Sequence, residues 1–250
     1  IAFHRKHLVG RFNQSFKIAL CHGFNYCYRY KDATFPINFV KVSSLKPMIL
    51  IDDFISGFSS LFTEQQSWQP WEITECLKEI IRIRILQLGD DYEITDEVAI
   101  HKTAVVETGA VLKSPTIIGP DCVVGAHAYF REGVFLDQSV KIGPGCEIKN
   151  SIIFSGTAIA HFNYVGNSVI GRNVNFEAGS IAANHYNERE NKRISVLYRG
   201  EVIDTGVNKF GSLVGDDSRI GANAVLSPGT ILEQNSIVRR LELIEQYKIE

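Results

Sequence analysis

The chain has 250 residues, of which 45% are hydrophobic, and a formal net charge of −2 at pH 7. This length allows one large domain or a domain with an appendage. The near-neutral charge argues against nucleic acid as a partner, because a phosphate backbone is normally met by a basic face. No apolar run reaches the roughly 18 residues of a bilayer span, and the N-terminus lacks a signal core, so we expect a cytoplasmic protein with no membrane span.

Residues 1–47 differ from the rest of the chain. They show no sustained periodicity and contain no methionine, and Met48 is the one methionine in the sequence. We therefore predict that Met48 is the natural start and that residues 1–47 are an N-terminal extension that is either not native or poorly ordered. The alternative is a genuine oligomerisation arm.

Residues 48–89 form a predicted helical linker segment. Pro70 suits the first turn of a helix, Glu72 complements the positive end of the helix dipole, and Gly89 is a typical stop. The spacing of four apolar residues indicates one buried face: Ile73, Leu77, Ile80 and Leu88. The segment is expected to pack against one end of the body that follows. Alternation over 81–85 leaves a strand as the alternative.

Beyond residue 90, large apolar residues recur with a period of six, as in Ile94, Ile100, Val106, Leu112, Ile118, Val124, Phe130, Leu136, Ile142, Ile148 and Phe154. A mostly small residue follows each by four positions, as in Ala104, Cys122, Ala128 and Cys146. This is the hexapeptide pattern of a parallel β-helix, in which three short strands make a coil of about eighteen residues. The sequence therefore predicts an all-β fold, a left-handed parallel β-helix over residues 90–240.

The period is interrupted once. Its register shifts near Ile159, disappears after Ala182 and returns at Val214. We predict an extruded loop over residues 183–213, and a structureless loop of this length is usually functional or disordered. Residues 241–250 are predicted to be a C-terminal tail that caps the last coil.

Two cations lie one coil apart. Arg131 and Lys149 are eighteen residues apart, so they are expected to stack on adjacent coils with about 4.8 Å between their backbones. Stacked like charges repel each other, which suggests an anion, such as a phosphate, beside them. The alternative is a solvated edge at which Glu132, Asp137 and Glu147 neutralise both cations.

The richest polar stretch, residues 159–185, contains a candidate general base. A neutral His161 can accept a proton near neutral pH, which suits deprotonation of an amine that attacks a thioester. Tyr164, Asn175 and Asn184 follow it, and asparagine can donate to a sugar hydroxyl or phosphate. An asparagine can also merely occupy a left-handed corner of the coil.

A metal site and a serine nucleophile are not indicated. His101, His127 and His161 offer no close pair at metal-ligand spacing, so no metal is expected to be required for catalysis. No GxSxG motif accompanies the histidine. The five cysteines lack a CxxC pair and are predicted to be free thiols: Cys21, Cys27, Cys76, Cys122 and Cys146.

The segments HFNYVGNSVIGRNVNFEAGSIAAN and GEVIDTGVNKFGSLVGDD resemble the C-terminal acetyltransferase domain of bifunctional sugar-1-phosphate nucleotidylyltransferase/acetyltransferases, especially the archaeal type. The resemblance covers about residues 70–238. It implies a homotrimer with active sites between subunits, in which acetyl-CoA acetylates the amine of a hexosamine 1-phosphate.

The resemblance also assigns site residues. His161 matches the general base, and Glu147 matches a carboxylate that orients it. Six residues match substrate contacts of the family: Arg131, Lys149, Tyr164, Asn175, Asn184 and Lys192. Arg131 and Lys149 match its phosphate-binding cations, and Lys192 falls near, but not in strict register with, a loop lysine of the family. Two residues depart from the family pattern: Glu177 replaces a glycine and is expected to intrude near the site, and His185 replaces a tyrosine.

The sequence leaves three functional hypotheses. The first is an acetyl-CoA-dependent N-acetyltransferase that acts on an amino-sugar phosphate such as glucosamine 1-phosphate. The second is an acyltransferase that uses acyl carrier protein and a nucleotide sugar. The third is a non-catalytic trimeric scaffold for a separate nucleotidyltransferase. No glycine-rich phosphate loop precedes the linker, so we expect this chain not to make nucleotide sugars by itself.

Overall fold

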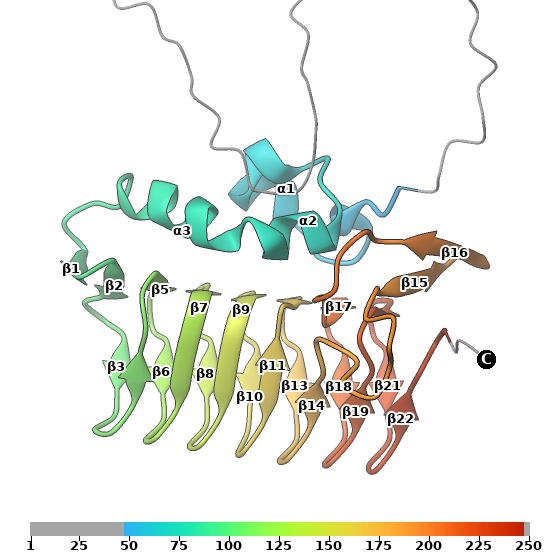
Figure 1. Cartoon of the computed structure of the whole chain (residues 1–250). Helices are drawn as coiled ribbons and strands as arrows, with labels where there is room; N and C mark the ends of the chain where they lie inside the picture. The colour runs from blue at the N-terminus through green and yellow to red at the C-terminus, as the bar shows by residue number, and fades with distance from the viewer. Residues whose placement is uncertain (1–47, 248–250) are drawn as a thin grey trace, which may run out of the picture. The chain divides into compact units, whose positions relative to one another are not determined.

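The computed structural model describes residues 48–247 (Figure 1). The predictions for residues 1–47 and for Cys21 and Cys27 therefore lie outside the described residues. The part of the chain that the structure describes contains no helix long and apolar enough to cross a membrane.

The described chain begins with a helical segment. Two short 3-10 turns, at Ile51–Asp53 and Thr63–Gln65, flank α1 (Phe58–Leu61), and α2 (Pro70–Glu75) and α3 (Leu77–Ile85) follow. α2 begins with a capping box, in which the Glu72 side chain accepts from the backbone N–H of Gln69 at 2.8 Å. Residues 81–85 are helical, so the strand alternative for them is wrong.

Parallel strands then wind into a β-helix with three faces. We call them face 1, face 2 and face 3. Face 1 contains β2 (Val98–His101), β5 (Thr116–Ile118), β12 (Val169–Ile170), β17 (Ser212–Val214) and β20 (Thr230–Leu232), with the second halves of β7 (Tyr129–Leu136) and β9 (Glu147–Ile153). Face 2 contains β4 (Val111–Leu112), β11 (Tyr164–Gly166), β14 (Ile181–Ala182), β19 (Val225–Leu226) and β22 (Leu243–Ile244), with the first halves of β7 and β9. Face 3 contains β3 (Val105–Val106), β6 (Val123–Val124), β8 (Lys141–Ile142), β10 (Ala158–Ile159), β13 (Asn175–Phe176), β18 (Arg219–Ile220) and β21 (Ile237–Val238). The predicted parallel β-helix is confirmed.

The interior of the coils is the first hydrophobic core. Phe130, Ile148 and Phe176 are fully buried there, each at 0% exposure, as the period of six predicts. The register shift, however, occurs earlier than Ile159. The interior position after Ile148 is taken by Ile153, and Phe154 belongs to a different core. Up to the extruded loop the pairing partners are then seventeen residues apart rather than eighteen, because the corners that follow Ile148 and Val165 are each one residue shorter. Beyond the loop the spacing of eighteen returns.

A second core lies outside face 1. The helical segment packs its apolar residues, such as Phe62 and Leu77, on outward side chains of face 1, such as Phe135 and Ile152. The helices therefore lie along a face of the coils, as Figure 1 shows, and the prediction that they pack against one end is wrong. The cause is the apolar outer surface of face 1. Strands that bury only their inner side would carry polar residues on the outer side. Faces 2 and 3 have no such helical cover within the described residues.

The two ends of the β-helix differ from prediction. β1 (Tyr92–Thr95) pairs antiparallel with β2, so Ile94 lies outside the parallel coils and is 45% exposed. At the other end, β22 pairs in parallel with β19. The β-helix thus extends beyond residue 240, into the predicted tail.

The predicted loop leaves the β-helix after β14 and returns at β17, at the corner between faces 2 and 1. It contains a β-hairpin that the sequence interpretation missed, formed by β15 (Ser195–Tyr198) and β16 (Glu201–Asp204). The two turn residues, Arg199 and Gly200, have φ angles of 50° and 78°. This backbone is typical of a two-residue hairpin turn. A short apolar run, Val196 to Tyr198, before an Arg-Gly pair was the missed signal.

Candidate functional site

Face 2 brings together two cations of the predicted site. Arg131 on β7 and Lys149 on β9 are direct neighbours in the strand register, as their spacing predicts. The Lys149 side chain is only 8% exposed, whereas that of Arg131 is 31% exposed. Burial lowers the pKa of Lys149, while the nearby negative charge of Glu132 acts in the opposite direction.

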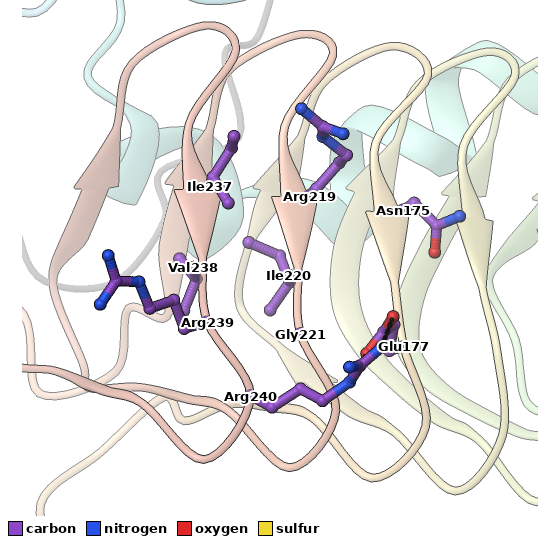
Figure 2. A pocket seen from close by; sticks show the side chains of 9 residues that line it. All are labelled: Asn175, Glu177, Arg219, Ile220, Gly221, Ile237, Val238, Arg239 and Arg240. Atoms are coloured by element: carbon purple, nitrogen blue, oxygen red, sulfur yellow. Dashed lines mark hydrogen bonds and ion pairs between the residues drawn. The ribbon is translucent and has the colours of Figure 1, made fainter.

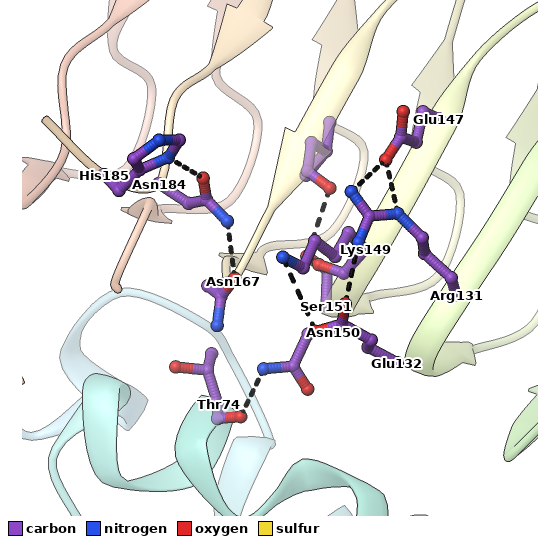
Figure 3. Close-up of polar contacts among 11 residues, drawn as sticks. Thr74, Arg131, Glu132, Glu147, Lys149, Asn150, Ser151, Asn167, Asn184 and His185 are labelled. Atoms are coloured by element: carbon purple, nitrogen blue, oxygen red, sulfur yellow. Dashed lines mark hydrogen bonds and ion pairs between the residues drawn. The ribbon is translucent and has the colours of Figure 1, made fainter. Parts of the chain in front are cut away.

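Two carboxylates neutralise this cation pair (Figure 3). The Glu147 carboxylate accepts from Nε and lies 2.7 Å from Nη2 of Arg131. Glu132 lies 2.7 Å from Nη1 of Arg131 and 3.5 Å from Nζ of Lys149. The contacts that the neutralised-edge alternative predicts are thus present for Glu132 with both cations and for Glu147 with Arg131. That alternative is wrong for Asp137, which lies 3.9 Å from Arg172 instead.

A glycine opposite Lys149 provides the space for two polar groups. Gly166 on β11 pairs with Lys149. A Cβ atom on Gly166 would stand 2.5 Å from the Tyr164 hydroxyl and 2.9 Å from the Asn184 amide nitrogen. Both groups therefore converge over this glycine, one coil from the cations. Burial, followed by the negative charge of Glu147, raises the pKa of Tyr164, so its hydroxyl stays protonated and can donate.

Asn184 is itself held in place. It is 3% exposed, and its amide donates to the side chain of Asn167 at 2.7 Å. Its side-chain oxygen lies 3.1 Å from Nδ1 of His185, the residue that departs from the family pattern. Asn184 therefore faces both the coil corner and the extruded loop.

The extruded loop adds a further positive charge that acts on Lys149. The charge of Lys209, near the end of the extruded loop, acts on Lys149 and helps to lower its pKa. Lys209 is exposed. In contrast, the predicted ligand Lys192 donates to the backbone carbonyls of Tyr186 and Asn187 at 3.1 and 2.8 Å. Lys192 therefore fixes the loop, and Lys209 is the loop lysine whose charge acts on Lys149.

His161 lies at the corner between β10 on face 3 and β11 on face 2, and its side chain is exposed. No side-chain hydrogen bond of His161 is found among residues 48–247. The predicted orienting residue Glu147 contacts Arg131 rather than His161. Within one chain, the histidine is thus available at the edge of the face that carries Tyr164.

Asn175 stands apart from the other site residues. It lies on β13 of face 3 and is exposed, whereas Arg131 and Lys149 lie on face 2. The left-handed corner is occupied by Asn173, with φ of 53°. Asn175 is therefore a strand residue, and the explanation that it merely occupies a left-handed corner is wrong for it.

Glu177 does not intrude on the cation pair. Both of its oxygens bind the guanidinium of Arg240 at 2.9 Å, and one accepts from the backbone N–H of Ala222 at 2.9 Å. These bonds lower its pKa. Figure 2 shows this pair in a shallow groove of face 3, which Arg219 and Arg239 also line.

Residues 48–247 contain no group of three or more His, Cys, Asp or Glu side chains that could hold a metal ion. Cys122 and Cys146, which are buried in the coils, are free thiols. The side chains described at the site offer cations, carboxylates, amides, a phenol and an imidazole.

Known proteins support the interpretation of the repeats. The family described as hexapeptide repeat of succinyl-transferase matches residues 115–159 and 213–239. A bifunctional sugar-1-phosphate nucleotidylyltransferase/acetyltransferase of Sulfurisphaera tokodaii is 34% identical over 167 residues, which are 64% of this chain and 41% of that protein. The bifunctional protein GlmU of Heliobacterium modesticaldum is 32% identical over 149 residues, 60% of this chain and 30% of that protein.

A solved hexapeptide transferase family protein of Anaplasma phagocytophilum is 19% identical, with a TM-score of 0.42, over 56% of this chain and 72% of that one. The chain spans less than half the length of the curated relatives it matches. It has a parallel β-helix built from hexapeptide repeats and is similar in sequence to part of bifunctional sugar-1-phosphate nucleotidylyltransferase/acetyltransferases.

Proposed function

We propose that the chain is an acetyl-CoA-dependent N-acetyltransferase that acts on an amino-sugar phosphate such as glucosamine 1-phosphate. The observation that carries this proposal is the register of face 2. Arg131 and Lys149 stand side by side, and Tyr164 and Asn184 converge over Gly166 opposite Lys149. Cations at one end and neutral hydrogen-bonding groups beside them suit a phosphorylated sugar.

The phosphate end of the substrate would lie against Arg131, Lys149 and Lys209. Lys149 is held rigidly by burial, and a rigid ammonium loses little conformational entropy when it binds an anion. Tyr164 and Asn184 would then orient sugar hydroxyl groups. Glu147 would act as a positioning residue, because it fixes the guanidinium of Arg131.

The reaction itself needs one base. The neutral amine attacks the thioester carbonyl carbon of acetyl-CoA, a C–N bond forms, and the C–S bond breaks to release the CoA thiolate. His161 would take the proton that the amine loses and pass it to the leaving sulfur. A general base of this kind typically contributes about 10² to 10⁴ in rate.

A second copy of the chain would complete the site. Asn175 lies on face 3, away from Arg131 and Lys149 on face 2. If face 3 of one copy packs against face 2 of the next, closed by a three-fold axis, Asn175 reaches the sugar from the neighbouring subunit. A homotrimer is therefore part of this proposal.

An assay of thiol release from acetyl-CoA tests the function. Glucosamine 1-phosphate and galactosamine 1-phosphate are offered as acceptors, with unphosphorylated glucosamine as the matched acceptor that lacks the anion. We expect turnover with at least one phosphorylated acceptor and much weaker turnover with glucosamine. No reaction with either phosphate ester, together with no binding of CoA by calorimetry, would refute the proposal.

A further inference from the structure

Glu132 lies between the two cations. One of its carboxylate oxygens lies 2.7 Å from Arg131 and the other 3.5 Å from Lys149. A single carboxylate that bridges two cations with its two oxygens stands where two oxygens of a bound oxyanion would lie. Lys78 of α3 adds a further positive charge near this carboxylate.

The corner that carries Glu132 differs from the next two corners above it. Glu132, Asn150 and Asn167 take the corner between faces 2 and 1 in successive coils, with φ angles of 61°, 49° and 47°. Asparagine adopts this left-handed backbone readily, whereas glutamate has no such preference. The Glu132 corner also contains one residue more, which produces a bulge between Arg131 and Val134.

The neighbouring corner residues have structural partners. Asn150 donates to the Thr74 carbonyl at 2.6 Å, and Asn167 accepts from Asn184. Glu132 is the charged member of this row of three. Its side chain points at the cations of the candidate site, as Figure 3 shows. The backbone conformation of the corner therefore does not explain why a glutamate stands there.

We propose that Glu132 is a specificity-determining residue whose carboxylate occupies the anion position between Arg131 and Lys149 until an anionic ligand displaces it. Displacement requires a ligand with at least two oxygens and more negative charge than a carboxylate. A phosphate monoester, which carries close to two charges at neutral pH, meets this condition. A phosphate diester carries one charge and competes poorly. The inference rests on the proposed function only for the identity of the sugar that carries the phosphate.

Binding of inorganic phosphate and of dimethyl phosphate by the full chain tests this inference without acetyl transfer. In Glu132→Gln, phosphate is expected to bind about tenfold tighter, the lower end of what a charge-assisted hydrogen bond contributes. Dimethyl phosphate should gain measurable binding. Glu132→Asn copies the residue of the next two corners and should fold and behave in the same way.

Glu97→Gln is the matched control. It changes the net charge equally and breaks an exposed ion pair with Arg82, 3.0 Å long, outside the cation cluster. Its phosphate affinity should equal that of the wild type. If Glu132→Gln binds phosphate no more tightly than the wild type, with an unchanged melting curve, Glu132 merely supports Lys149 and the inference is wrong.

The two proposals fail separately. Absence of acetyl transfer, combined with tighter phosphate binding by Glu132→Gln, would refute the function and retain the role of Glu132. Acetyl transfer to a phosphorylated amino sugar, combined with unchanged phosphate affinity in the variant, would retain the function and refute the role of Glu132.

Discussion

Replacement of Lys149 by methionine separates the binding role of this lysine from its structural role. Methionine fills a similar volume but carries no charge. Glu132 would not become an isolated charge, because it keeps Arg131 at 2.7 Å and is 40% exposed. The usual cost of about 3–5 kcal/mol for breaking a buried ion pair therefore does not apply. We expect the free energy of unfolding to change by less than about 1 kcal/mol.

The expected functional loss of Lys149→Met is much larger. A charge-assisted hydrogen bond from a lysine that is only 8% exposed contributes about 1.5–3 kcal/mol, or roughly a tenfold to hundredfold change in kcat/KM. Thiol release with glucosamine 1-phosphate measures this loss, and urea denaturation measures stability. Lys102→Met, an exposed lysine between β2 and β3 in the first coil, is the matched control. A fall in stability of more than about 3 kcal/mol, or an unchanged kcat/KM, would contradict the assignment of Lys149 to substrate phosphate.

Three other predictions follow from single residues. His161→Gln should lower the rate of acetyl transfer by about 10²-fold or more. The circular dichroism spectrum and the melting curve should stay unchanged, because the His161 side chain is exposed. Retained activity would exclude His161 as the base. Phe176 is 0% exposed in the coil interior, so Phe176→Ala should lower the free energy of unfolding, measured by urea denaturation, by about 3–5 kcal/mol. A loss below about 1 kcal/mol would mean that the coil rearranges to fill the cavity. Burial raises the pKa of Cys122 to about 11, so this thiol should react slowly with a thiol reagent at pH 8. The contribution of Cys122 to the free energy of unfolding should be lost only as the pH rises from the unfolded pKa of 9.0 toward 11. Rapid labelling at pH 8 would contradict its burial.

The coil interior could be predicted from the sequence because its signal is strictly local. Each interior residue follows the last by six positions, and burial of Phe130 and Ile148 confirms that pattern. The same reasoning misplaced Phe154, because a corner shortened by one residue leaves the apolar spacing almost unchanged. Ile153 and Phe154 are both apolar, and only the helices on face 1 distinguish an inward from an outward side chain.

The site was predictable to the extent that strand register fixes it. A spacing of eighteen residues places Arg131 beside Lys149 wherever no corner changes length. The electrostatic effect of the extruded loop could not be found in this way, because no period connects Lys209 with Lys149. The contact between Glu147 and Arg131 was predicted only by the alternative in which carboxylates neutralise the cations. The resemblance pointed to His161, whereas the nearest cation in the register, Arg131, takes the carboxylate.

The shortened corners also decide what stands next to Lys149. If eighteen residues separated every pair, Asn167 would lie beside Lys149, and its side chain would fill the space that Tyr164 and Asn184 share. With the observed spacing of seventeen, Gly166 takes that position and Asn167 moves to the corner, where it accepts a hydrogen bond from Asn184. The loss of one residue thus opens the space beside the buried lysine and at the same time supplies the asparagine that holds the group above it.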